Sequence, residues 1–153
     1  MMTNSKIRTR VILGVSLLVL FTASTLTGFT QSMTFSPYKI VLNAQGTAES
    51  FLSVIRMPIV PGYTLSGYDV ELLVNDQYVA DAYSFRYCYI DQNFLAEFDR
   101  MEVLNSPVVR ALANTTAVAT VRGSYRAVNQ AGETVTVSFS TTASIEIVAP
   151  QKK

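Results

Sequence analysis

The chain has 153 residues, and charged residues make up 15% of them, well below the roughly 25% of an average globular protein. Three of the twelve basic residues lie among the first ten positions, so nine bases remain against the eleven acids, which all follow position 48. A domain with this slightly negative balance lacks the basic surface that binds nucleic acid or anionic lipid, so both are excluded as partners of the domain.

The first 29 residues have the order of a secretory leader. Lys6, Arg8 and Arg10 come first, the almost wholly apolar run Val11–Phe21 follows, and small residues come next. No charge occurs in the 19 residues from 11 to 29, which is also just long enough for an uncleaved hydrophobic anchor helix. We favour a cleaved signal peptide over a signal anchor. Under either interpretation the rest of the chain is exported, and a membrane is contacted only through this N-terminal segment.

Residues 30–38 are predicted to be a linker or a segment that adds a strand to the open sheet edge of a neighbouring copy. The apolar side chains of such a donor segment are Phe29, Met33, Phe35 and Tyr38. An ordinary first strand is the remaining alternative. Residues 39–149 are predicted to form one domain, with a short tail at 150–153.

The first half of this domain shows the two-residue alternation of half-buried strands. Strands are predicted at Lys39–Ala44, Ser50–Met57 and Tyr68–Val74. The pair Asn75-Asp76 then predicts a two-residue hairpin turn into the longest run, Tyr78–Ile90.

Beyond this run the strand period continues briefly and then breaks. A turn at Asp91-Gln92-Asn93 leads into a predicted strand at Phe94–Phe98. Asp99–Glu102 has the spacing of a helix capping box, and Ser106-Pro107 offers an N-cap followed by proline at the first helical position. With Asn114 closing the second turn, one or two short helical turns are predicted to bridge two strands.

The last forty residues predict three more strands. These are Ala117–Val128, Thr134–Ser140 and Ser144–Val148, the first two joined by a turn at 129–132. Seven or eight short strands at this spacing predict an all-β fold, a β-sandwich with a short helical bridge.

The residue types that carry most catalysis and metal binding are scarce. The chain has no histidine, which removes the commonest general base and metal ligand. Cys88 is the only cysteine, so no disulfide or zinc cluster forms within the chain, and we expect it to be a free, buried thiol. The carboxylates lack the alternating spacing of a calcium loop. No catalytic residue, metal or cofactor is therefore expected.

The most suggestive feature is a row of aromatic residues at alternate positions of the longest strand: Tyr83, Phe85, Tyr87 and Tyr89. We favour burial of this row as the core face of the strand. If exposed, the row would form a binding surface for glycans or a partner protein, because tyrosine offers contact area at low entropic cost. Separately, Asn114-Thr115-Thr116 is a glycosylation sequon that export would make usable.

The second half of the chain resembles the Ig-like domains of secreted and cell-surface proteins of bacteria and archaea. The resemblance lies in Phe94–Glu102 with its Phe-Asp-Arg turn, in the short helical bridge, and in the Ser/Thr-rich final strands Ala117–Val128 and Thr134–Val148. It covers about the last hundred residues and implies a sandwich fold with a structural or adhesive role. It supplies no functional residues, and such domains usually belong to much longer proteins.

Three functions follow as hypotheses. The first is a non-catalytic secreted or cell-surface domain, structural or adhesive, that binds a protein or glycan. The second is a subunit of an extracellular filament that self-associates by strand donation through residues 29–42. The third and least favoured is a hydrolase that relies on carboxylates alone.

Overall fold

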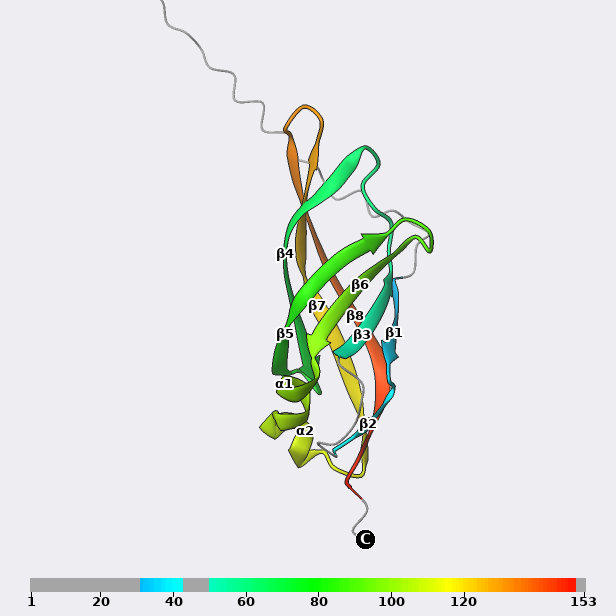
Figure 1. Ribbon diagram of the computed structural model, residues 1–153, viewed down its shortest axis with the longest axis vertical. Helices are drawn as coiled ribbons and strands as arrows, with labels where there is room; N and C mark the ends of the chain where they lie inside the picture. Colours follow the sequence, from blue (N-terminus) through cyan, green and yellow to red (C-terminus); the bar gives the residue numbers. More distant parts are fainter. Residues whose placement is uncertain (1–30, 43–49, 151–153) are drawn as a thin grey trace, which may run out of the picture.

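The computed structural model describes residues 31–42 and 50–150. Eight strands and two short helices occur in this part of the chain (Figure 1). Their bounds are β1 Ser32–Ser36, β2 Lys39–Val41, β3 Ser50–Arg56, β4 Tyr63–Val74, β5 Gln77–Cys88, β6 Asn93–Asp99, α1 Arg100–Asn105, α2 Pro107–Ala111, β7 Thr115–Asn129 and β8 Thr134–Val148. The predicted all-β class and the short helical bridge are confirmed, and the number of strands agrees with the predicted seven or eight.

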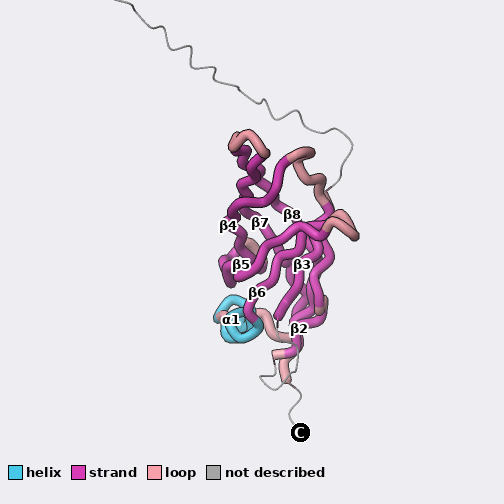
Figure 2. The backbone as a smooth tube through the Cα atoms, turned by 45° about the horizontal axis from the view of Figure 1, so that its top comes forward, coloured by secondary structure: helices cyan, strands magenta, loops and turns pink. Residues whose placement is uncertain are grey.

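The strands form one hydrogen-bonded series in the order β1-β3-β6-β5-β4-β7-β8-β2. All neighbours are antiparallel except β2 and β8, which are parallel. The series folds over at β5, whose first half pairs with β4 and whose second half pairs with β6. Figure 2 shows the resulting arrangement, with the β3–β6–β5 layer crossing the β4–β7–β8 layer and the helices gathered at one end.

Aromatic side chains fill the space between these two layers. Phe85 of β5 stacks on Phe139 of β8, with ring centroids 5.5 Å apart, and Phe94 of β6 meets Tyr125 of β7 at 4.8 Å. These rings, together with fully buried aliphatic side chains such as Ile55 and Leu72, form a single core. Burying this much aromatic and branched surface is the main driving force for the fold, and the described part of the core needs no disulfide.

The segment predicted to be a linker or strand donor contains β1, and the predicted strand that follows it begins with β2; these two strands lie at opposite edges of the series. β1 pairs with β3, and after a cis Ser36–Pro37 peptide β2 pairs with β8. Phe35 is buried against Phe51, Met33 is half-buried and Tyr38 is exposed. Phe29, the leader at 1–29, and the last residues of the predicted strand at 39–44 lie outside the described residues. Strand donation to another copy stays a prediction.

Local turn and cap chemistry explains the connections on both sides of β5 and β6. Asn75 and Asp76 have φ values of 47° and 64°, as a type I′ hairpin turn requires, so the predicted turn is confirmed. Asp99 caps α1 through a 2.9 Å hydrogen bond that its carboxylate accepts from the Glu102 N–H. Pro107 begins α2, as expected from its fixed φ. Neither helix in the described residues is long and apolar enough to cross a membrane.

The two strands predicted at Thr134–Ser140 and Ser144–Val148 are one continuous strand, so that prediction is wrong. β8 stays in register with β7 from Thr134 to Ile147 without a shift. The Ser/Thr stretch between the predicted strands contains no glycine or proline to turn the chain, and Thr141 within it is buried. Small β-branched and hydroxyl residues therefore extend the strand there.

Gly123 of β7 lies directly against the backbone of β4. A Cβ atom built there would lie 2.0 Å from the backbone oxygen of Asp69 on β4. The contact is with backbone, so a side chain at this position forces the central strands of the β4–β7–β8 layer apart.

We therefore expect Gly123→Ala to lower the free energy of unfolding by roughly 2 kcal/mol or more, measured by urea denaturation. Gly67→Ala is the matched control, because its added methyl group would meet only the terminal atoms of the Arg126 side chain, which can move away. Equal losses in both variants would contradict the close packing at Gly123.

Candidate ligand-binding cleft

The aromatic row of β5 does not lie on one face of the strand, so the prediction of a single buried face is wrong. The pairing of β5 with β6 shifts between Ala82 and Ser84, leaving Tyr83 as an extra residue. Such a bulge exchanges the inward and outward positions of the residues that follow it. Ala80 and Ala82 are buried before the shift, and the odd-numbered residues turn inward after it.

The four aromatic residues consequently have three different environments. Tyr83 is 55% exposed on the outer face, whereas Phe85 is only 3% exposed within the core. Phe85 is therefore excluded from any binding surface. The prediction that all four aromatic residues could form one exposed binding surface is wrong. Tyr87 is half-buried and Tyr89 is 67% exposed, and both lie where β5 ends. The sequence-predicted site thus reduces to Tyr87 and Tyr89.

These two tyrosines line an open cleft of about 580 Å³. Their rings meet edge to face, with centroids 5.0 Å apart and an interplanar angle of 88°. Tyr87 also rests on buried Phe94 at 4.8 Å, so the inner ring is held by the core while the outer ring faces solvent. The remaining lining comes from the end of β3 and the chain after it, and from the β5–β6 turn: Arg56, Met57, Pro58, Ile59, Asp91 and Gln92.

The polar side chains of the cleft are available to a ligand. Among the described residues, neither the guanidinium of Arg56 nor the side-chain amide of Gln92 has a hydrogen-bond partner. The Asp91 carboxylate accepts one weak contact, from the Cys88 thiol at 3.5 Å. The Arg56 guanidinium, the Gln92 amide and the Asp91 carboxylate thus line the cleft together with apolar side chains, as is typical of small-ligand sites.

Sequence reasoning missed every lining residue except the two tyrosines. Pro58 and the turn at Asp91-Gln92-Asn93 were correctly predicted to end strands. Their proximity, however, depends on the pairing of β3 with β6, whose partners lie about forty residues or more apart in the sequence. No local pattern in the sequence carries that information.

Tyr125 of β7 lies in the core beside the floor of the cleft. It is 1% exposed, and its hydroxyl has no hydrogen-bond partner among the described residues. Burial, and to a lesser degree the neighbouring Tyr87, raises the pKa of Tyr125 to about 12. An unpaired hydroxyl inside a protein contributes a desolvation cost with no compensating bond.

We expect Tyr125→Phe to leave the free energy of unfolding unchanged at pH 7 or to raise it by about 1 kcal/mol. The pH dependence gives a second measurement. The unfolded tyrosine loses its proton near pH 10 and the folded one near 12, so stability is complete below pH 10 and declines between these values. Urea denaturation at pH 7 and 11 should show a smaller decline in Tyr125→Phe than in the wild type. A variant that is less stable at pH 7 would contradict the unpaired hydroxyl.

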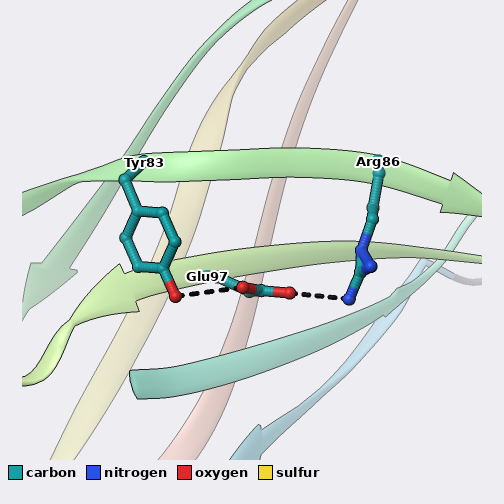
Figure 3. A network of polar contacts seen from close by, with 3 residues as sticks. All are labelled: Tyr83, Arg86 and Glu97. Carbon is teal, nitrogen blue, oxygen red and sulfur yellow. Dashed lines mark hydrogen bonds and ion pairs between the residues drawn. The ribbon is translucent and has the colours of Figure 1, made fainter. Parts of the chain in front are cut away.

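A second group of polar side chains lies on the outer face of β5 and β6 (Figure 3). Glu97 accepts a hydrogen bond from the Tyr83 hydroxyl at 3.0 Å through one carboxylate oxygen and pairs with Arg86 at 2.7 Å through the other. The Tyr68 hydroxyl donates to the backbone oxygen of Tyr83 at 2.9 Å. Because these groups already satisfy one another, this face offers a ligand fewer free partners than the cleft does.

The two other predicted sites are only partly as expected. Cys88 is a free cysteine but is half-buried at the end of β5, so the prediction of a fully buried thiol is wrong. Asn114 is exposed in the turn before β7, with φ 61°, and its side-chain oxygen accepts a 3.0 Å hydrogen bond from the Ala149 N–H. Glycosylation of Asn114 stays a prediction. Within residues 31–42 and 50–150, no three Cys, Asp or Glu side chains gather as a metal site.

Comparison of the chain with known proteins identifies no family for it. No protein-family model matches the chain, and no curated protein matches it. A solved structure, SusF from Bacteroides thetaiotaomicron, aligns with a TM-score of 0.44 and 14% sequence identity, covering 81% of this chain and 28% of that one. The chain thus spans little more than a quarter of SusF, and at this similarity the alignment supports no conclusion about function.

Proposed function

We propose that this chain is an exported, non-catalytic binding domain whose ligand, a glycan or a protein at a cell surface, occupies the Tyr87–Tyr89 cleft. The observation that carries the proposal is the pair of tyrosines at the end of β5, one fixed on the core and one open to solvent. Aromatic side chains exposed in this way cost little entropy when they bind.

The chemistry of the cleft suits a glycan in particular. A sugar ring has one apolar face of C–H groups, which packs on an aromatic ring, and a rim of hydroxyls that both donate and accept hydrogen bonds. Tyr89 supplies the ring, while Arg56, Asp91 and Gln92 supply donors and acceptors at the edge. An extended peptide would use the same apolar floor, formed by Met57, Pro58 and Ile59.

The strand order supports the narrower assignment of an Ig-like sandwich. In Ig-like domains one layer has the order A-B-E-D and the other contains C, F and G. Here β1-β3-β6 and the second half of β5 correspond to the first layer, and β4-β7-β8 to the second. One N-terminal stretch of chain supplies an edge strand to each layer, β1 to the first and β2 to the second.

Export is supported by the sequence alone. The basic, apolar and small-residue order of residues 1–29 is that of a secretory signal, and the sparsely charged remainder suits an extracellular surface. The proposal that the domain is not an enzyme has similar support. The chain has no histidine, and both carboxylate oxygens of Glu97, at the centre of the outer-face group, are already engaged.

The cleft predicts which tyrosine matters for binding. We expect Tyr89→Ala to weaken retention on the best-bound matrix of a glycan and cell-wall panel by roughly fivefold or more, as for an interface anchor. The free energy of unfolding of this variant, measured by thermal denaturation, should be unchanged within about 0.5 kcal/mol, because Tyr89 is mostly exposed.

Tyr83→Ala is the matched control, since Tyr83 is similarly exposed but lies outside the cleft. Retention that falls in Tyr83→Ala and persists in Tyr89→Ala would move the site to the outer face of β5 and β6 and contradict the proposal. Equal retention of all three proteins would exclude both tyrosines from binding.

A further inference from the structure

The strand β8 has a long edge that no other strand of the described chain covers. On one side β8 pairs with β7 from Thr134 to Ile147. On the other side it pairs only with β2, and only through Glu146, Ile147 and Val148. The stretch from Thr134 to Ile145 therefore has an unpaired side.

Two hydrogen bonds show which backbone groups face this unpaired side. The Glu146 N–H donates to the Tyr38 oxygen at 2.8 Å, and the Val148 oxygen accepts from the Leu42 N–H at 2.9 Å. Even-numbered residues of β8 therefore point their N–H and C=O groups away from β7. Because the register with β7 never shifts, the same direction holds back to Ser138, Thr136 and Thr134.

Part of this edge is shielded and part is open. β2 runs parallel to β8, with Lys39 opposite Glu146. Because β1 comes before β2 in the chain, it lies beside the residues of β8 that come before Glu146. β1 does approach β8 but does not pair with it. The outer end, Thr134–Ser138, belongs to the β7–β8 hairpin, whose turn lies at the opposite end of the domain from the helices (Figure 1).

The open edge lacks the features that keep other edges from pairing. Natural edge strands are usually short or carry prolines and charges, which prevent the addition of another strand. β1 and β2 fit this pattern, since they have only five and three residues. Pro37 directly follows β1, and β2 begins with the charged residue Lys39. From Thr134 to Ile145 there is no charged residue, proline or glycine.

We propose that the outer end of β8, Thr134–Ser138, pairs antiparallel with the same residues of a second copy of this chain, forming a two-fold dimer. Pairing centred on Thr136 places Val135 opposite Val137 of the second copy and Thr134 opposite Ser138. Val135 and Val137 are half-buried and lie on one face, while the hydroxyl residues are exposed on the other. Both kinds of cross-strand pair are favourable, and no like charges meet.

A second copy is favoured over a different partner because the segment is complementary to itself. Thr134–Ser138 carries no charge that would select a partner of opposite charge. Two-fold pairing also uses every outward N–H and C=O of the segment in both copies at once. None of these residues lines the Tyr87–Tyr89 cleft, so the dimer would carry two clefts and bind a repetitive surface more tightly than one domain does.

The assembly state of the exported protein, measured by size exclusion with light scattering, tests this pairing. We expect a dimer that becomes a monomer, with half the mass, in Thr136→Pro and in Thr136→Lys. Proline removes an N–H that faces the open side and leaves the ladder to β7 intact, and lysine places a charge beside its own symmetry mate. Thr142→Lys is the control, because Thr142 is exposed on the same face of β8 but lies outside the pairing segment, and this variant should stay dimeric.

Cross-linking gives a second readout that does not depend on the proline variant folding. In a Cys88→Ser background, Thr136→Cys should form a disulfide between copies under mild oxidation, because paired Cα atoms in a sheet lie about 5.5 Å apart. Thr142→Cys should remain reduced. A wild type that stays monomeric up to about 1 mM, a dimer that survives both Thr136 variants without this cross-link, or a polymer in place of a dimer would each overturn the proposal.

Discussion

The structure depends on one strand, β5, which belongs to both layers and changes face partway along. Its first half extends the β4–β7–β8 layer, and its second half extends the β3–β6 layer. The extra residue at Tyr83 turns Phe85 into the core, where it contacts Tyr68, Phe94, Tyr125 and Phe139 from both layers. Without that change of face, Phe85 would point to solvent and the two layers would lose the ring that contacts them both.

The cleft is a consequence of the same change of face. Once odd-numbered residues point inward, Tyr87 packs on Phe94 at the rim of the core and Tyr89 follows it into solvent as the strand ends. Tyr87 is therefore packed against the core, whereas the Arg56 guanidinium and the Gln92 amide have no hydrogen-bond partner among the described residues. An aromatic ring that is already held in place before a ligand arrives lowers the entropic cost of binding.

Much of the fold could be predicted because its signals are local. Asn75-Asp76 forms the hairpin turn, Asp99 caps α1 and Pro107 begins α2, each through its own local chemistry. Alternation in Ser50–Arg56 likewise marks its buried face. The face of the β5 aromatics was not predictable in this way, because the bulge at Tyr83 is defined only by the partner strand. The cleft was missed for the same reason, since Arg56 and Gln92 meet only through non-local pairing.

Amide chemical-shift mapping shows whether a ligand binds at the Tyr87–Tyr89 cleft. The isotopically labelled exported protein would be titrated with soluble oligosaccharides and cell-wall fragments. We predict that the amide signals of residues 56, 57, 59 and 87–92 shift, with smaller changes at Phe94 and Tyr125. Changes centred on Tyr83, Arg86 and Glu97, or none with any compound at millimolar concentration, would contradict it.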